Sequence, residues 1–133
     1  MSNAIPEGWA DLLTREKRAF ADLALVMQDG TPHVSPVWFD LQDGLIVINT
    51  ARGRLKDKVL RHHPQVAMSI LDPDSSYRYL LIRGPVVEET EADGYERICD
   101  LNLKYHGNPD YPRVPGQVRV TYKIRPEHVF AGQ

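Results

Sequence analysis

The stretch from Asn49 to Pro64 constrains the fold most, because its hydrophobic period changes from that of a strand to that of a helix. The apolar, β-branched run at residues 45–48 leads into it and is typical of a buried strand. Beyond Gly53, leucine and valine side chains follow helical spacing until Pro64 ends the helix. The sequence therefore predicts a strand, a tight turn that contains glycine, and a short helix.

The predicted turn and helix are strongly basic. They hold five of the chain's 16 lysines and arginines: Arg52, Arg54, Lys56, Lys58 and Arg61. A helix start presents free backbone N–H groups and the positive end of the helix dipole. Arginine adds planar two-point contacts to phosphate. These features predict a phosphate site, and the alternative is a positively charged helix face that only contacts solvent, since charge runs on exposed helices are common.

The rest of the chain predicts strands joined by hairpin turns. Strands are expected at residues 19–27, 33–40, 45–48, 66–71, 77–87 and 118–124, and residues 128–130 could extend the last one. The Asp-Gly pairs at residues 29–30 and 43–44 suit tight hairpin turns. Pro36 cannot donate to a strand ladder, so its strand should have an edge or a bulge there. Gly84-Pro85 predicts a bend or bulge in the long fifth strand.

Three helices complete the expected elements, at residues 6–13, 55–63 and 92–105. Six antiparallel strands in a chain of 133 residues favour a small closed barrel. We therefore expect a mainly β protein: a six-stranded antiparallel barrel with flanking helices. It should form a single domain over residues 1–133, with residues 1–6 as a flexible N-terminus.

Composition argues against several classes of function. The net charge of −2 provides no overall basic field to attract nucleic acid. No apolar run approaches the roughly 20 residues of a membrane helix, and the N-terminus does not resemble a signal peptide. The only cysteine, Cys99, allows no internal disulfide, which favours the cytoplasm. His62 and His63 point about 100° apart on a helix and cannot share a metal ion without a third ligand, so no metal site is expected.

Three patterns occur in a characteristic order along the chain. The first is DGTPHVSPVWF at residues 29–39. The second is NTARGRLK at residues 49–56, followed by LRHHPQVA at residues 60–67. The third is DPD at residues 72–74, followed by YRY at residues 77–79 and Arg83-Gly84. Together they resemble the flavin-binding split barrel of the pyridoxamine-phosphate-oxidase-like superfamily, from about residue 8 to residue 130. The sequence is most similar to the branch that uses the deazaflavin coenzyme F420 in actinobacteria.

The resemblance implies a homodimer that binds F420, or alternatively FMN, at the interface between its subunits. Arg54 and Lys56 would hold the cofactor phosphate, with Lys58 and Arg61 nearby. Asn49, Thr50 and Ala51 would line the path of the ribityl chain. The edge of the ring would pass the backbone of Ser35, Pro36, Val37 and Trp38. Tyr77 and Tyr79 would come from the second subunit. Trp38 and the two tyrosines could instead be ordinary core or interface aromatics.

The implied activity is that of an oxidoreductase that passes hydride to a small conjugated acceptor. The ring of such a cofactor carries the hydride, so the lack of an obvious catalytic dyad is no objection, and no catalytic residue is assigned. The alternatives are a non-catalytic cofactor carrier and an FMN-dependent enzyme similar to pyridoxamine phosphate oxidase. The C-terminal residues 126–133 lack an arginine-rich segment, which argues against vitamin B6 activity. A nucleic-acid module is disfavoured, because no aromatics alternate with the basic residues.

Overall fold

The computed structural model describes residues 5–133, so the expected flexible segment 1–6 lies mostly outside the described residues. A short 3-10 helix at Ala10–Leu13 comes first. The strands and helices then follow in the order β1 (Ala21–Val26), β2 (Pro32–Val37), β3 (Asp40–Gln42), β4 (Leu45–Ala51), α1 (Leu55–His62), β5 (Gln65–Asp72), β6 (Ser75–Thr90), α2 (Gly94–His106), β7 (Arg119–Ile124) and β8 (His128–Gly132). The expected mainly β, antiparallel class is confirmed.

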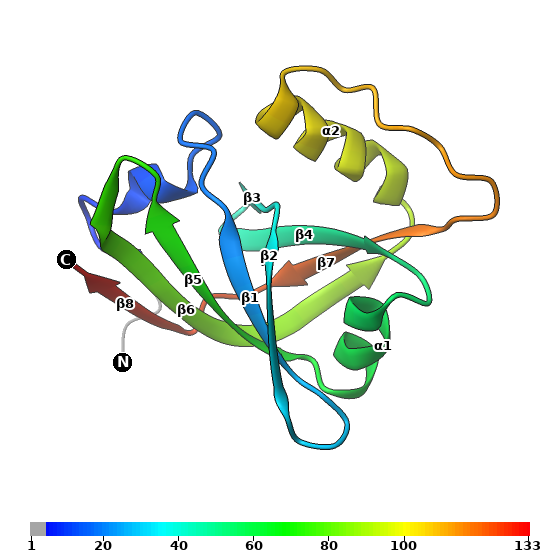
Figure 1. Ribbon diagram of the computed structural model, residues 1–133, viewed down its shortest axis with the longest axis horizontal. Coiled ribbons are helices and arrows are strands. Elements are labelled where there is room, and N and C mark those ends of the chain that lie inside the picture. The colour runs from blue at the N-terminus through cyan, green and yellow to red at the C-terminus, as the bar shows by residue number, and fades with distance from the viewer. Residues whose placement is uncertain (1–4) are drawn as a thin grey trace.

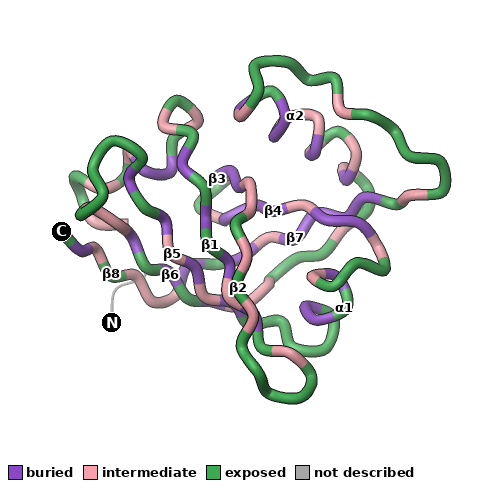
Figure 2. The backbone as a smooth tube through the Cα atoms, viewed as in Figure 1, coloured by how far each residue is buried: buried purple, intermediate pink, exposed green. Residues whose placement is uncertain are grey.

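All strands belong to one antiparallel sheet that curves around the core (Figure 1). The strand order is β2-β1-β5-β6-β7-β4-β3, and β8 pairs with β6. Buried positions alternate along β1 and β5, are nearly continuous along β4 and β7, and occur on both α1 and α2 (Figure 2). The core contains Leu23, Ile48, Ile70, Ile82 and Tyr122, each at most 1% exposed. Burial of these side chains is the main favourable contribution to folding.

Within residues 5–133, the sheet has eight strands where the sequence predicted six. The expected strand at residues 33–40 divides because Phe39 turns into the core, where it is fully buried. Its carbonyl oxygen accepts a hydrogen bond of 2.6 Å from Lys104 Nζ, and its N–H donates to Tyr105 Oη at 3.3 Å. These contacts from α2 take the place of strand pairing, so β2 ends at Val37.

The second difference is β8, which pairs with β6 instead of extending β7. The chain between β7 and β8 crosses β6 at Gly84, where a Cβ atom would overlap the carbonyl oxygen of Arg125. The bend expected at Gly84-Pro85 occurs where β6 changes from pairing with β5 to pairing with β7. Pro36 lies in β2, which pairs with β1 and is an edge strand of the sheet that residues 5–133 form.

The two helices flank the end of β4 (Figure 1). On α1, Val59 and Leu60 face the core, whereas Lys58 and Arg61 are exposed. On α2, Ile98 and Leu101 are buried. Over residues 5–133, neither helix combines the length and the apolar character that crossing a membrane requires. Because α1 and α2 both turn buried side chains toward the sheet, side chains from both helices enclose the end of β4.

Candidate functional site

A cleft of about 540 Å³ lies where β2 and β4 end, between the first turn of α1 and one side of α2. Seven of the predicted site residues line it: Pro36, Val37, Trp38, Asn49, Thr50, Arg54 and Lys56. The wall is completed by Leu55, Ile98, Leu101 and Tyr111. Residues that are far apart in the sequence thus surround one space large enough for a small-molecule ligand.

The turn that leads into α1 is fixed by the carboxylate of Asp57, which is fully buried. This carboxylate accepts hydrogen bonds from Gly53 N at 2.9 Å and from Tyr122 Oη at 2.6 Å. Gly53 has a φ of +89°, a conformation that glycine adopts without steric strain. Burial raises the pKa of Asp57, but hydrogen bonds from Tyr122, Gly53 and Arg52 outweigh burial and keep this pKa below its usual value. The turn is therefore held in one shape by a buried charge.

The five basic residues of the turn and helix are not equivalent. Arg52 Nη1 lies 2.9 Å from Asp57 Oδ1 and also pairs with Glu89, and Arg52 Nε lies 2.8 Å from Glu91. Hydrogen bonds to these carboxylates, led by Glu91, raise the pKa of Arg52. Three carboxylates therefore neutralise this guanidinium, which leaves it little capacity to bind a ligand anion.

Arg54 and Lys56 face the cleft and, within the described part of the chain, neither has a carboxylate within 4.0 Å. Burial, with a further contribution from the charge of Arg54, lowers the pKa of Lys56. Arg54 occupies the N-cap position of α1, and no side chain caps this helix start. Free N–H groups and uncompensated positive charge therefore meet at one end of the cleft, an arrangement that favours an anion.

The other predicted residues lie outside the cleft. Lys58 is exposed on α1. Arg61 is exposed as well, and its Nη1 lies 3.9 Å from Asp57 Oδ2 while its Nε lies 4.0 Å from Glu89 Oε2. Ala51 is buried opposite Arg119, and the Ser35 hydroxyl is buried without a hydrogen-bond partner among residues 5–133. Tyr77, which is 79% exposed, and Tyr79 are on β6, and neither lines the cleft of its own chain.

The end of the cleft at Trp38 is apolar. The Trp38 ring stacks on Tyr105 of α2, with a centroid distance of 5.2 Å and an interplanar angle of 15°. Tyr105 Oη donates a hydrogen bond of 2.6 Å to the carbonyl oxygen of Ala19, and burial raises the pKa of this tyrosine to about 12. This part of the wall therefore offers a flat apolar surface close to the residues that precede β1.

Sequence reasoning missed Ile98, Leu101 and Tyr111 as parts of the wall. The helical spacing of apolar residues such as Ile98 and Leu101 can predict that they are buried, but not which strand they pack against. Tyr111 lies in an irregular loop, where no period marks an inward-facing side chain. The loop is held there by a hydrogen bond of 2.6 Å from Tyr95 Oη to the Tyr111 carbonyl oxygen.

The cleft therefore has two chemically different ends, one cationic and one apolar. This arrangement suits a ligand with a phosphate at one end and a flat ring system at the other. The amide of Asn49 is already engaged: its Nδ2 donates to the Gly94 carbonyl oxygen at 2.8 Å, and its Oδ1 accepts from Arg119 Nε at 2.9 Å. Asn49 thus contributes a fixed side chain to the wall of the cleft. In residues 5–133, no three His, Cys, Asp or Glu side chains are grouped so that they could hold a metal ion.

Comparison with known proteins agrees with this geometry. A family model described as pyridoxamine 5'-phosphate oxidase matches residues 6–131. A solved structure named F420 reductase is 33% identical, with a TM-score of 0.85, over 95% of this chain and 98% of that one. No curated protein sequence matches the chain significantly.

More distant structures share the fold. The conserved hypothetical protein Rv2991 from Mycobacterium tuberculosis is 22% identical, with a TM-score of 0.75, over 98% of this chain and 86% of that one. General stress protein 26 from Bacillus anthracis is 17% identical, with a TM-score of 0.63, over 92% of each chain. The family model covers nearly the whole chain, and the resemblance expected from the sequence is confirmed. This protein belongs to the pyridoxamine 5'-phosphate oxidase-like family of FMN-binding split barrels.

Proposed function

We propose that this protein is an oxidoreductase that binds F420 in the cleft and transfers hydride to a small conjugated acceptor. The observation that carries the proposal is the uncompensated charge of Arg54 and Lys56 at one end of a cleft whose other end is apolar. F420 is preferred to FMN because the structure named F420 reductase is 33% identical over 95% of the chain. The two cations suit either cofactor, since both carry a phosphate on a ribityl chain.

Each part of the cleft has a proposed role. Arg54 and Lys56 bind the phosphate, the ribityl chain follows Asn49 and Thr50, and the ring passes the backbone of residues 36–38. When bound, the deazaflavin supplies the hydride chemistry. Trp38, Ile98 and Leu101 exclude water from the ring and fix its orientation, and a dry, ordered site strengthens the polar contacts made within it.

A second copy of the chain is part of the proposal. A groove of about 610 Å³ follows the outer side of β1, β5, β6 and β8, and it is lined mainly by apolar side chains. Phe130 is 58% exposed and Val34 64% exposed. Contiguous exposed apolar surface of this kind marks an interaction site. Because β2 contributes Val34 to this surface and Pro36 to the cleft, a second subunit on this face would reach the cleft.

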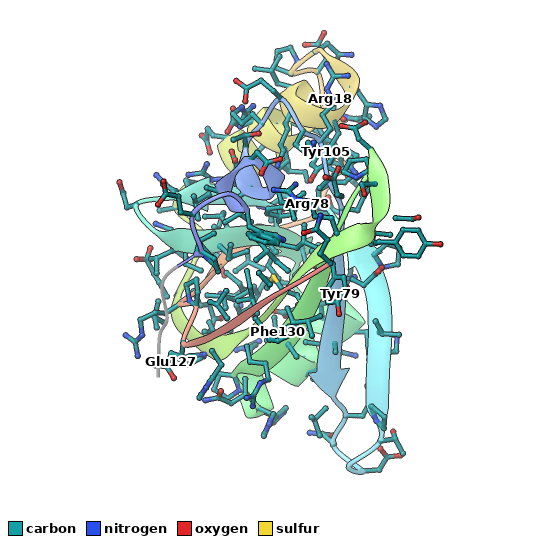
Figure 3. The ribbon with its side chains drawn as sticks, turned by 90° about the vertical axis from the view of Figure 1, so that its left-hand side faces the viewer. Arg18, Arg78, Tyr79, Tyr105, Glu127 and Phe130 are labelled. Carbon is teal, nitrogen blue, oxygen red and sulfur yellow. The ribbon has the colours of Figure 1, made fainter. Side chains whose placement is uncertain are left out.

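Tyr77 and Tyr79 fit this arrangement. Tyr79 of β6 lies beside Gly132 of β8. Phe130 precedes Gly132 by two residues on β8 (Figure 3). Tyr77, Tyr79 and Leu81 are alternate residues of β6 and so lie on one side of the strand, and Leu81 lines the groove. Both tyrosines therefore border the face proposed for the dimer, although neither lines the cleft of its own chain. In the dimer, they would supply aromatic surface to the partner's ring site.

Ligand titration tests the proposal directly. Purified protein is titrated with F420 and, in parallel, with FMN, and binding is followed by the fluorescence of each cofactor. Tight binding of F420, together with oxidation of its reduced form by a quinone, an enone or a nitro compound that takes up the hydride, would support an F420-dependent oxidoreductase. Binding without turnover across that panel would indicate a carrier, and binding of FMN alone would identify a flavin protein.

A further inference from the structure

A second pocket, of about 370 Å³, lies beside the loop that connects α2 to β7. We call it the loop pocket; its charged residues are Arg113 and Arg119, and its lining contains no aspartate or glutamate. Arg119 is the first residue of β7 and is only 7% exposed. Its Nε donates to Asn49 Oδ1 at 2.9 Å, and its Nη1 lies 3.5 Å from Gln117 Oε1.

The charge of Arg119 has no counterion in the described part of the chain, where no carboxylate lies within 4.0 Å of its guanidinium. This is unusual, because a buried charge is normally paired or bound to a ligand. The guanidinium also lies 5.4 Å from the centroid of the Tyr111 ring, a contact that supports it without neutralising it. An oxyanion is the natural partner for its remaining donors.

Arg113 provides a second cation at the same pocket. Its guanidinium lies 3.6 Å from the centroid of the Tyr95 ring. Among residues 5–133, Arg113 likewise has no carboxylate within 4.0 Å. Two guanidinium groups, each placed on a tyrosine ring, therefore border one small space, and both retain planar donor groups for two-point contacts.

The walls of the loop pocket are fixed before any ligand binds. Pro112 and Pro115 limit the backbone conformations of the loop. Gln117 N donates to the Val114 carbonyl oxygen at 3.0 Å, which closes a turn that contains Pro115 and leads into β7. A site ordered in advance loses less conformational entropy when a ligand binds.

The loop pocket adjoins the cleft, because Asn49 and Tyr111 line the cleft and both contact Arg119. We propose that Arg113 and Arg119 form a second oxyanion site, which binds a carboxylate or phosphate group. The anion could be an acidic group that the ligand in the cleft carries beyond its phosphate, or it could be a free small anion. The first source rests on the proposed function, whereas the second does not.

Calorimetric titration with F420, FMN and citrate distinguishes the sources. F420 carries carboxylates beyond its phosphate, whereas FMN ends at its phosphate. If the cofactor supplies the anion, R113A and R119Q should each weaken F420 binding about tenfold, the effect of removing a charged hydrogen-bonding partner, and leave FMN binding unchanged. If a free anion binds, both variants should instead weaken citrate binding in an R54A background, which weakens the other anion site.

The matched control is R125A, because Arg125 is an exposed arginine that pairs with Glu127 at 2.8 Å outside both pockets. R113A changes an exposed side chain and keeps the test valid even if R119Q folds poorly. The proposal is overturned if R113A alters neither F420 nor citrate binding, or if F420 and FMN weaken equally in both variants. If wild-type protein binds neither cofactor, the proposed function fails, and citrate still decides whether the loop pocket binds anions.

Discussion

At the scale of single residues, the phosphate contact depends on Arg54 and Lys56, the two basic side chains of the cleft, which have no carboxylate within 4.0 Å among residues 5–133. We predict that Arg54→Ala and Lys56→Ala each weaken cofactor binding by about 1–3 kcal/mol, the range for hydrogen bonds to charged groups. Lys58→Ala is the matched control, because Lys58 has the same charge on the same helix but faces solvent. Fluorescence titration measures all three, and unchanged affinity in both cleft variants would place the phosphate elsewhere.

The lowered pKa of Lys56 predicts a pH dependence for the same contact. Burial and the charge of Arg54 keep this pKa below the usual 10.5, and a bound anion raises it because the anion favours the charged amine. The affinity for the anion should therefore be highest below the pKa that Lys56 has in the free protein. Above that pKa the affinity should fall by up to about tenfold per pH unit, until the pH reaches the higher pKa that Lys56 has in the complex.

Lys56→Arg separates this titration from others in the protein, because arginine stays charged throughout the range. One such group is Lys104, whose pKa burial lowers to about 8. The dissociation constant for FMN is measured from pH 7 upward, where its phosphate is already ionised. Wild-type affinity should decline at high pH while that of Lys56→Arg stays level. Equal declines in both proteins would show that Lys56 does not contact the phosphate.

At the scale of elements, the turn between β4 and α1 depends on a buried hydrogen bond from Tyr122 to Asp57. Tyr122→Phe keeps the ring in the core but removes one donor to the carboxylate, so we predict that it lowers the free energy of unfolding by about 1.5–3 kcal/mol. It should also weaken cofactor binding, since the turn presents Arg54. Urea denaturation measures the first effect. Tyr77→Phe is the control, because Tyr77 is 79% exposed, and an equal loss there would contradict the role of the buried bond.

The local elements of this fold were predictable, and the long-range contacts were not. The change of period at Gly53 specified β4 and α1 within a few residues of sequence. The break at Phe39 depends on Lys104, which is distant in sequence, and the separate strand β8 depends on the crossing at Gly84. In the site, the sequence showed Arg52 and Arg54 as equal charges. Only the folded chain brings Glu89 and Glu91 to Arg52 and leaves Arg54 free.

At the scale of the whole molecule, the proposed dimer makes the cofactor site dependent on a surface outside the cleft. We predict that wild-type protein is a dimer by light scattering and that Phe130→Glu is a monomer, because the substitution puts a charge on the exposed apolar face. Leu103→Glu is the matched control, since Leu103 is 42% exposed on α2 and lies outside that face, so this variant should stay dimeric.

The same pair of variants tests whether the cofactor site is shared between subunits. If Tyr77 and Tyr79 of one subunit cover the ring bound by the other, monomeric Phe130→Glu should bind F420 more weakly while its own Arg54 and Lys56 remain unchanged. Affinity should then recover at protein concentrations that restore the dimer, because assembly and ligand binding are thermodynamically linked. A folded monomer that binds F420 as tightly as the wild type would show that each chain holds the complete site. In that case the apolar face would have a role independent of the cofactor.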